Sequence, residues 1–152
     1  MAKIHLINGE FERALELAIA PAIKAGFPSP AQDYLVDSID FNRDLIRHPE
    51  ATFYGRVDGD SMIEAGIDDG DICVIDRSVE AQDGDIVVGF INGEFTIKFL
   101  DLSHREEGYY ELRPANPNYK PIRITEDDNF EVWGVVVWTI KRTRRNVRHN
   151  RL

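Results

Sequence analysis

The 152-residue sequence contains a single cysteine, Cys73, which excludes an internal disulfide framework and any cysteine-based zinc site. Such sparse use of cysteine fits a protein of a reducing cytoplasm. Cys73 lies in the apolar run 71–76, which we interpret as a buried strand. We therefore expect a structural thiol there rather than a nucleophile.

Long hydrophobic runs are absent too, and no apolar stretch approaches the length needed to cross a bilayer. The first residues lack a cationic start that leads into an apolar segment, so we expect no signal peptide and no membrane association. The composition is 43% hydrophobic and 30% charged, as in an ordinary globular protein. The length suits one domain, with or without an arm.

Recognisable metal and phosphate motifs are also missing. There is no glycine-rich phosphate loop, and the acidic runs 68–71 and 83–85 look like turns that do not match a calcium loop. We therefore expect no metal and no cofactor. The four histidines have neither metal-ligand nor triad spacing and are interpreted as surface residues: His5, His48, His104 and His149.

Positive charge is scarce except at the C-terminal end. The net charge is −9, yet residues 141–152 hold six Lys or Arg and no acid, which leaves the first 140 residues at −15. Such a body is unsuited to binding duplex DNA through phosphate contacts, so we expect no direct sequence-specific DNA binding. We interpret the basic tail 143–152 as a disordered, solvated end; contact with nucleic acid or an acidic partner is the alternative.

Short β-forming segments dominate the sequence after position 51. They are separated by Gly, Pro and Asp, and Asn92-Gly93 predicts a tight hairpin turn. The expected fold is all-β, a compact barrel or sandwich of short, mostly antiparallel strands. The expected strands are 52–57, 72–75, 85–91, 94–100, 109–113, 122–124 and 132–140.

The N-terminal part has weaker signals. Helical spacing over 11–24 predicts at most a short helix before Pro21, and 40–48 predicts a second short amphipathic segment. In 25–30, Gly26 and two prolines favour an extended hinge, which is either an ordinary linker or an accessible peptidase substrate. We expect three parts: a flexible arm (1–30) with a self-cleavage site, a β-rich peptidase-like domain (31–142) and the tail (143–152).

The final apolar segment, 132–140, contains both tryptophans. A strand that is apolar on both faces is either central in a sheet or paired with another chain, because an exposed apolar edge invites association. A homodimer is therefore expected.

Ser61 lies in the sequence Gly59-Asp60-Ser61-Met62, directly after an expected strand. A serine at the start of a turn can present its hydroxyl where backbone N–H groups converge, as an oxyanion hole requires. Glycine, aspartate and serine are also ordinary turn residues, so the pattern alone is weak.

Lys98 lies in an apolar strand, 94–100, in which side chains alternate between two faces. Burial there would lower its pKa from an ordinary value of about 10.4 and yield a neutral amine able to take the Ser61 proton. That is the serine–lysine form of nucleophile activation. The alternative is a lysine whose stem packs while its ammonium group reaches water.

Taken together, these motifs resemble the UmuD-like members of the LexA-type self-cleaving serine–lysine peptidase family. The resemblance covers about 25–142, and the tail after Arg142 lies beyond it. It rests on the runs AGFPSP (25–30), VDGDSM (57–62), GD (70–71), GDIV (84–87), GEFTIK (93–98), LRPANPNY (112–119) and VWGVV (132–136).

The resemblance implies specific roles. Ser61 would be the nucleophile and Lys98 the general base. The backbone amides of Asp60 and Ser61 would form the oxyanion hole, and the Ala25–Gly26 bond would be cut, within the same chain or in a dimer mate.

The resemblance also implies partners. Cleavage in this family is promoted by RecA filaments on single-stranded DNA during the SOS response to DNA damage. The truncated homodimer then joins a Y-family translesion polymerase subunit (UmuC-like) in the cytoplasm.

Two other functions remain open: a non-catalytic dimeric β interaction module and a truncated phage-type repressor. LexA-like repressors carry a helix-turn-helix domain before the cleavage site, and the 25 residues before Gly26 are too few for one. Membrane signal peptidases also use a serine and a lysine but need a membrane anchor.

Overall fold

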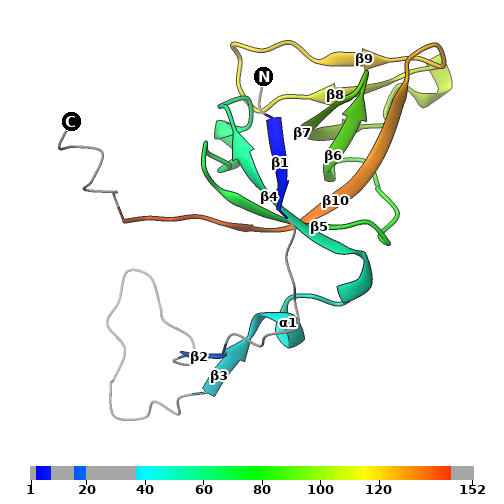
Figure 1. Cartoon of the computed structure of the whole chain (residues 1–152). Coiled ribbons are helices and arrows are strands. Elements are labelled where there is room, and N and C mark those ends of the chain that lie inside the picture. The colour runs from blue at the N-terminus through cyan, green and yellow to red at the C-terminus, as the bar shows by residue number, and fades with distance from the viewer. Residues whose placement is uncertain (1–2, 8–15, 20–36, 145–152) are drawn as a thin grey trace. The chain divides into compact units, whose positions relative to one another are not determined.

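The computed structural model of the protein describes residues 3–7, 16–19 and 37–144 (Figure 1). The chain divides into two units, each considered by itself: a barrel unit (Met1–Gly9 and Ala51–Leu152) and a second unit (Glu10–Glu50). The elements are β1 (Lys3–Ile7), β2 (Glu16–Ile19), β3 (Asp37–Asp40), α1 (Phe41–Asp44), β4 (Thr52–Asp58), β5 (Ile72–Asp76), β6 (Ile86–Ile91), β7 (Glu94–Asp101), β8 (Tyr110–Arg113), β9 (Ile122–Ile124) and β10 (Phe130–Ile140), with single 3₁₀ turns at Pro49–Ala51, Ile63–Ala65 and Arg105–Glu107.

Six antiparallel strands close into a barrel in the order β1-β4-β5-β10-β6-β7, and β7 returns to β1. β8 and β9 extend the sheet from β7. Closure leaves few unpaired strand edges, which otherwise template association. The predicted all-β fold is therefore confirmed.

The long strand β10 connects the two halves of the barrel, because its first half pairs with β6 and its second half with β5 (Figure 1). The register shifts between Val132 and Gly134 and again between Val136 and Trp138. Gly134 is needed at this bend, since a Cβ atom there would lie 2.6 Å from Cγ2 of Ile75. Irregular pairing of this kind lets one strand turn a barrel corner.

The β6–β7 hairpin aligns the strand that carries Lys98. Its turn is formed by Asn92 (φ 49°) and Gly93 (φ 85°), and Ile91 pairs with Glu94 across it. Positive φ at both central residues gives the turn the right-handed twist of the strands, as the Asn-Gly pair predicts. The hairpin fixes the register of β7 and hence which way Lys98 points.

The barrel has two buried apolar clusters. One contains Ile4, Val57, Met62, Ile67, Cys73, Ile75, Val88 and Ile97, and the other contains Val87, Leu100, Leu112, Ile124 and Val135. β7 contributes to both clusters, so it is buried on both faces.

The N-terminal expectations are corrected in two places. β1 lies within the expected flexible arm, yet Lys3–Ile7 is a strand of the barrel. The helical spacing over 11–24 gave the wrong element, because Glu16–Ile19 is a strand paired with β3. The second expected helix is confirmed as the short α1, whose N-cap Asp40 accepts hydrogen bonds from the backbone N–H groups of Asn42 and Arg43.

The buried cluster predicts where truncation destabilises the barrel. Ile75→Ala should lower the free energy of unfolding by about 2–5 kcal/mol, because Ile75 is fully buried and its loss leaves a cavity. Ile63→Ala is the matched control, since Ile63 is 42% exposed and should cost well under half as much. Urea titration followed by tryptophan fluorescence measures both; equal losses would contradict this assignment of the core.

Candidate active site

Lys98 lies on β7 with its amine inside the barrel unit, and the residue is only 1% exposed. Its Nζ atom lies 2.7 Å from Ser61 Oγ, 2.9 Å from the carbonyl oxygen of Ile97 and 3.2 Å from Thr96 Oγ1. The amine thus has three polar neighbours in an otherwise apolar strand. The alternative interpretation of the sequence, a lysine whose ammonium group reaches water, is therefore wrong, because Lys98 is buried.

Burial lowers the pKa of Lys98 from 10.5 to about 8. The physical cause is desolvation, which disfavours the charged form of an amine. At mildly alkaline pH a large fraction of the amine is therefore neutral and able to accept a proton.

Ser61 follows β4 on a tight loop and is fully buried. Gly59 has φ 110°, a conformation that favours glycine, and its N–H donates to Asp69 Oδ1 at 2.9 Å. Met62, the next residue along, is fully buried in the same apolar cluster as Ile97. The serine is therefore held between a fixed glycine turn and a buried methionine.

A second loop, residues 114–119, holds the serine loop from the other side. Asn116 Nδ2 donates to the carbonyl oxygen of Asp60 at 2.9 Å, and the Tyr119 hydroxyl donates to Asp60 Oδ1 at 2.5 Å. The N–H of Ala115 donates to the carbonyl oxygen of Ser61 at 2.8 Å. These contacts fix the backbone orientation of the residues whose amides are expected to form the oxyanion hole.

The return of the loop into β5 is fixed by charge. Lys141 Nζ lies 2.5 Å from carboxylate oxygens of both Asp68 and Asp71. Asp71 also accepts from the N–H of Asp68, and its carbonyl oxygen accepts from the N–H of Val57. The end of β10 is thereby tied to the loop that carries Ser61.

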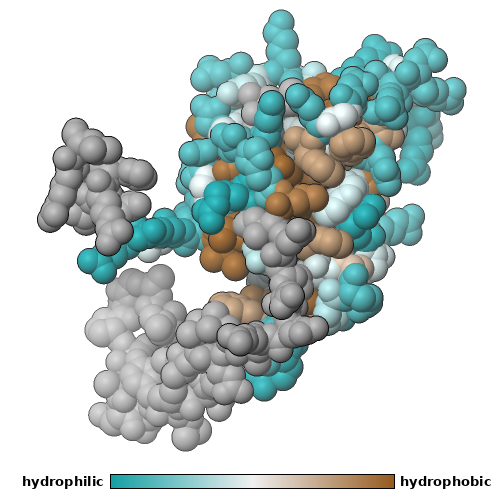
Figure 2. Space-filling model, in the orientation of Figure 1, coloured by the Kyte–Doolittle hydropathy of each residue, from teal (hydrophilic) through white to brown (hydrophobic). Residues whose placement is uncertain are grey.

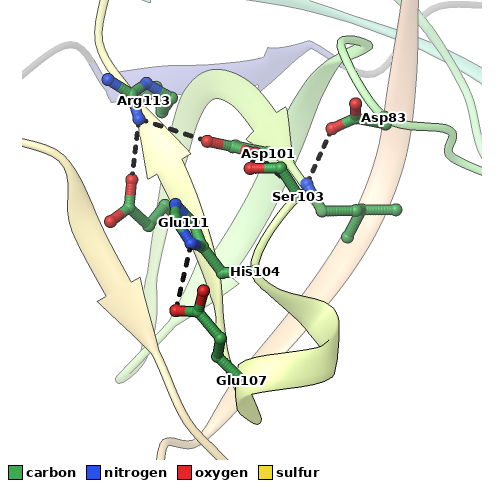
Figure 3. A network of polar contacts seen from close by, with 8 residues as sticks. Asp83, Asp101, Ser103, His104, Glu107, Glu111 and Arg113 are labelled. Atoms are coloured by element: carbon green, nitrogen blue, oxygen red, sulfur yellow. Dashed lines mark hydrogen bonds and ion pairs between the residues drawn. The ribbon is translucent and has the colours of Figure 1, made fainter.

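One further group of polar residues brings together potential metal ligands. Ligand atoms of Asp101, His104 and Glu111 lie within 4.8 Å of one another (Figure 3). Arg113 bridges the two carboxylates, at 3.2 Å from Asp101 and 2.9 Å from Glu111. Its guanidinium group already supplies the positive charge that a cation would bring, so we assign this network a structural role. His104, expected at the surface, has a side chain that is 30% exposed, and nothing in its sequence spacing groups it with these acids.

Cys73 is buried, and burial raises the pKa of its thiol to about 11. A thiol with a raised pKa is a poor nucleophile at neutral pH, which agrees with the structural role expected from the sequence.

The structure thus brings Ser61 and Lys98 together, although 37 positions separate them in the sequence. Asp60 lies in the same loop as Ser61, whereas Ala25 and Gly26 lie outside the described residues. Alternation along 94–100 places Thr96 on the same face as Lys98, whereas Asn116 and Tyr119 were not predicted as neighbours of the site. Asn116 and Tyr119 were visible only as part of an Asn-Pro turn, and nothing local shows that this turn contacts Asp60.

Comparison with known proteins decides the family. The model of the family described as "Peptidase S24-like" matches residues 18–137. The chain belongs to the Peptidase S24-like family. Protein SamA of Salmonella typhimurium is 43% identical over 120 residues, which cover 79% of this chain and 81% of SamA. Protein MucA of Escherichia coli is 43% identical over 120 residues, which cover 78% of this chain and 79% of MucA.

A LexA repressor is similar as well. The protein of Desulfatibacillum aliphaticivorans is 40% identical over 129 residues, which cover 84% of this chain and 62% of that repressor. The resemblance to UmuD-like, LexA-type peptidases is therefore confirmed. In the part of the S24 chain that the structure describes, no helix has the length and apolar character needed to cross a membrane.

The buried amine of Lys98 and the exposed, ion-paired amine of Lys141 should titrate far apart. Lys98 should lose its proton near pH 8, because burial disfavours its charge. Lys141 is the matched control, since the hydrogen bonds that its amine donates to Asp68 and Asp71 raise its pKa above the ordinary value of 10.5. Carbon chemical shifts of the lysine side chains, followed by NMR against pH, measure both; a Lys98 midpoint at or above that of Lys141 would contradict the site.

Proposed function

We propose that this chain is a self-cleaving serine peptidase of the SOS response. Ser61 is the nucleophile, Lys98 is the general base, and the bond between Ala25 and Gly26 is cut. The observation that carries the proposal is the 2.7 Å contact between Lys98 Nζ and Ser61 Oγ, both of them buried.

The neighbours of the amine support this assignment of roles. A neutral amine has two N–H groups and one lone pair. Thr96 Oγ1 and the Ile97 carbonyl oxygen accept hydrogen bonds from these two N–H groups. The lone pair of the amine is then left to accept the proton of the Ser61 hydroxyl group. A base oriented in this way needs no histidine or aspartate to hold it.

Acylation follows from this arrangement. Lys98 takes the hydroxyl proton while Ser61 Oγ bonds to the carbonyl carbon of Ala25. The negative charge that forms on the Ala25 oxygen is stabilised by the backbone N–H groups of Asp60 and Ser61. The carbon–nitrogen bond then breaks, and the Lys98 ammonium group returns its proton to the Gly26 amine, which leaves an ester on Ser61.

Water completes the reaction. Lys98, neutral again, takes a proton from water as its oxygen attacks the ester carbon. The ester bond breaks, Ser61 regains its proton from Lys98, and residues 1–25 end in a carboxylate. The contacts of Asn116 and Tyr119 with Asp60 support this step too, since they hold the loop whose amides bind the charged oxygen.

The biological setting rests on family membership. The names SamA and MucA belong to similar proteins, and one LexA repressor is similar over most of this chain. We propose that RecA filaments on single-stranded DNA promote cleavage in the cytoplasm, and that the truncated homodimer binds a Y-family, UmuC-like translesion polymerase. Mass spectrometry before and after mixing with RecA, nucleotide and single-stranded DNA tests the first part.

Variants of the two site residues test the chemistry. Ser61→Ala and Lys98→Ala should each abolish the appearance of a fragment ending at Ala25, while circular dichroism shows an unchanged fold. In the wild type the rate should rise with pH through about 8 and then level off, because the neutral form of Lys98 is the base. Below that pH each unit should slow cleavage about tenfold.

Ser103→Ala and Lys120→Ala serve as controls, because both residues are exposed whereas Ser61 and Lys98 are buried, and both variants should cleave at the wild-type rate. Normal cleavage by Lys98→Ala would show that another group is the base. No fragment from the wild type, even with activated RecA, would favour the non-catalytic β module.

Exposed apolar residues on β10 support the proposed homodimer. Three large apolar residues near the end of β10 are exposed: Val137, Trp138 and Ile140. On the face of the barrel unit shown in Figure 2, apolar side chains gather in a patch between hydrophilic ones. We propose that the C-terminal half of β10 contributes to the dimer interface.

Sedimentation tests the proposed interface. The wild type should be a dimer at micromolar concentration, and Trp138→Glu should raise the dissociation constant at least about tenfold, because a charge would replace a large aromatic contact. Ile63→Glu is the control, since Ile63 is similarly exposed but lies outside β10. A wild type that sediments only as a monomer would exclude the dimer.

A further inference from the structure

β1 fills the seam between β4 and β7 and so closes the barrel. All five of its residues pair with β4, from Lys3 opposite Asp58 to Ile7 opposite Tyr54, and Lys3 also pairs with Thr96 on β7. Without β1, both β4 and β7 would present unpaired backbone groups at this seam, an arrangement that binds extended peptides.

The seam fits the alternating pattern of β1. Ile4 is 3% exposed within the buried cluster, and Leu6 packs against the same cluster. Lys3 and His5 point the other way, with Lys3 Nζ 3.7 Å from Glu94 and His5 Nε2 3.2 Å from Asp58. A ligand for this seam is therefore an extended segment with aliphatic residues at alternate positions and basic residues between them.

β4 is adapted to the presence of this strand at one position. A Cβ atom on Gly55 would lie 2.6 Å from Ile4 Cγ1 and 2.9 Å from the His5 carbonyl oxygen. Only a residue without a side chain lets β1 approach so closely. Gly55 is thus the position of β4 at which β1 packs most closely against it.

β1 has only one covalent link to the rest of the barrel unit, through residues 8–50. We propose that the seam between β4 and β7 is a strand-binding site, and that cutting this link converts β1 from a fixed barrel strand into an exchangeable peptide ligand. The biological form of the inference rests on the proposed self-cleavage at Ala25–Gly26, which lies within the link.

The energetic reason is the loss of effective concentration. The covalent link keeps β1 at a high effective concentration beside its seam, so the intact chain disfavours competing peptides. After the cut, residues 1–25 are no longer tethered and can exchange with peptides in solution. A five-residue strand anchored mainly by Ile4 and Leu6 is then held by affinity alone.

The experiment separates this inference from self-cleavage. A Ser61→Ala variant of the full chain carries a recognition sequence for a site-specific protease between Ala25 and Gly26, so that the link is cut by an added enzyme. The probe is a fluorescent synthetic peptide of residues 1–9. Its anisotropy reports binding, and mass spectrometry reports release of the original fragment.

The peptide should bind the cut protein saturably, displace the original fragment and bind the uncut protein at least about tenfold more weakly. A peptide carrying Ile4→Ser should not bind, whereas His5→Ser should bind within about twofold of the wild-type sequence, because the ion pair of His5 with Asp58 is exposed and contributes little. Absence of binding to the cut protein, or equal binding to cut and uncut protein, would overturn the proposal. If fragment loss unfolds the barrel, excess peptide should refold it, and failure to refold would overturn the proposal equally.

Two glycine variants locate the binding site. Gly55→Ala in the cut protein should weaken peptide binding about tenfold, because its methyl group collides with Ile4. Gly89→Ala is the control: it introduces a similarly close contact, 2.8 Å from Phe130 Cε2, beside the buried cluster that does not contain Ile4, and should leave the peptide affinity unchanged. Equal effects of the two variants would place the peptide elsewhere, against the proposal.

Discussion

The structure depends on a lysine amine that folding removes from water. The drop in the pKa of Lys98 from 10.5 to about 8 corresponds to about 3 kcal/mol by which folding disfavours the ammonium form. The unfolded chain holds this proton more tightly between those two values, so this residue makes the fold more stable as pH rises from about 8 toward 10.5. The neighbours Ser61, Thr96 and Ile97 keep the amine hydrogen-bonded, which limits the cost of burial.

Holding the amine near the serine requires two loops of distant origin to meet. The serine loop follows β4 and the 114–119 loop follows β8, yet Asn116 and Tyr119 fix Asp60 from 56 and 59 positions away. Charge adds a third tie through Lys141, at the end of β10. Because misplacing a reacting group by about 1 Å can cost about 10²-fold in rate, a serine nucleophile at this position would depend on these distant contacts as well as on the lysine.

Local sequence patterns predicted most strands of the barrel, but not that β1 closes it. The Asn92-Gly93 turn and the alternation over 94–100 were enough to place β6 and β7 and to put Lys98 on one face with Thr96, but not to show that this face is buried. β1 was missed because a five-residue strand at the chain start shows its partner only in three dimensions. β2 was misread because its short apolar stretch also fits a helical period. The pair Ser61 and Lys98 was identified through family resemblance, since residue patterns alone left a solvent-reaching lysine as a competing interpretation.

The strand that closes the barrel and the neighbours of both site residues pack into one buried cluster. Ile4 of β1 belongs to the same buried cluster as Met62, which follows Ser61, and Ile97, which precedes Lys98. Packed interiors respond to the loss of a side chain by opening or shifting, so departure of β1 would relax the surroundings of both site residues. An enzyme that cuts its own chain needs only one turnover, and it loses nothing if its base regains water afterwards. β1, which closes the barrel, therefore helps to keep the surroundings of Lys98 dry.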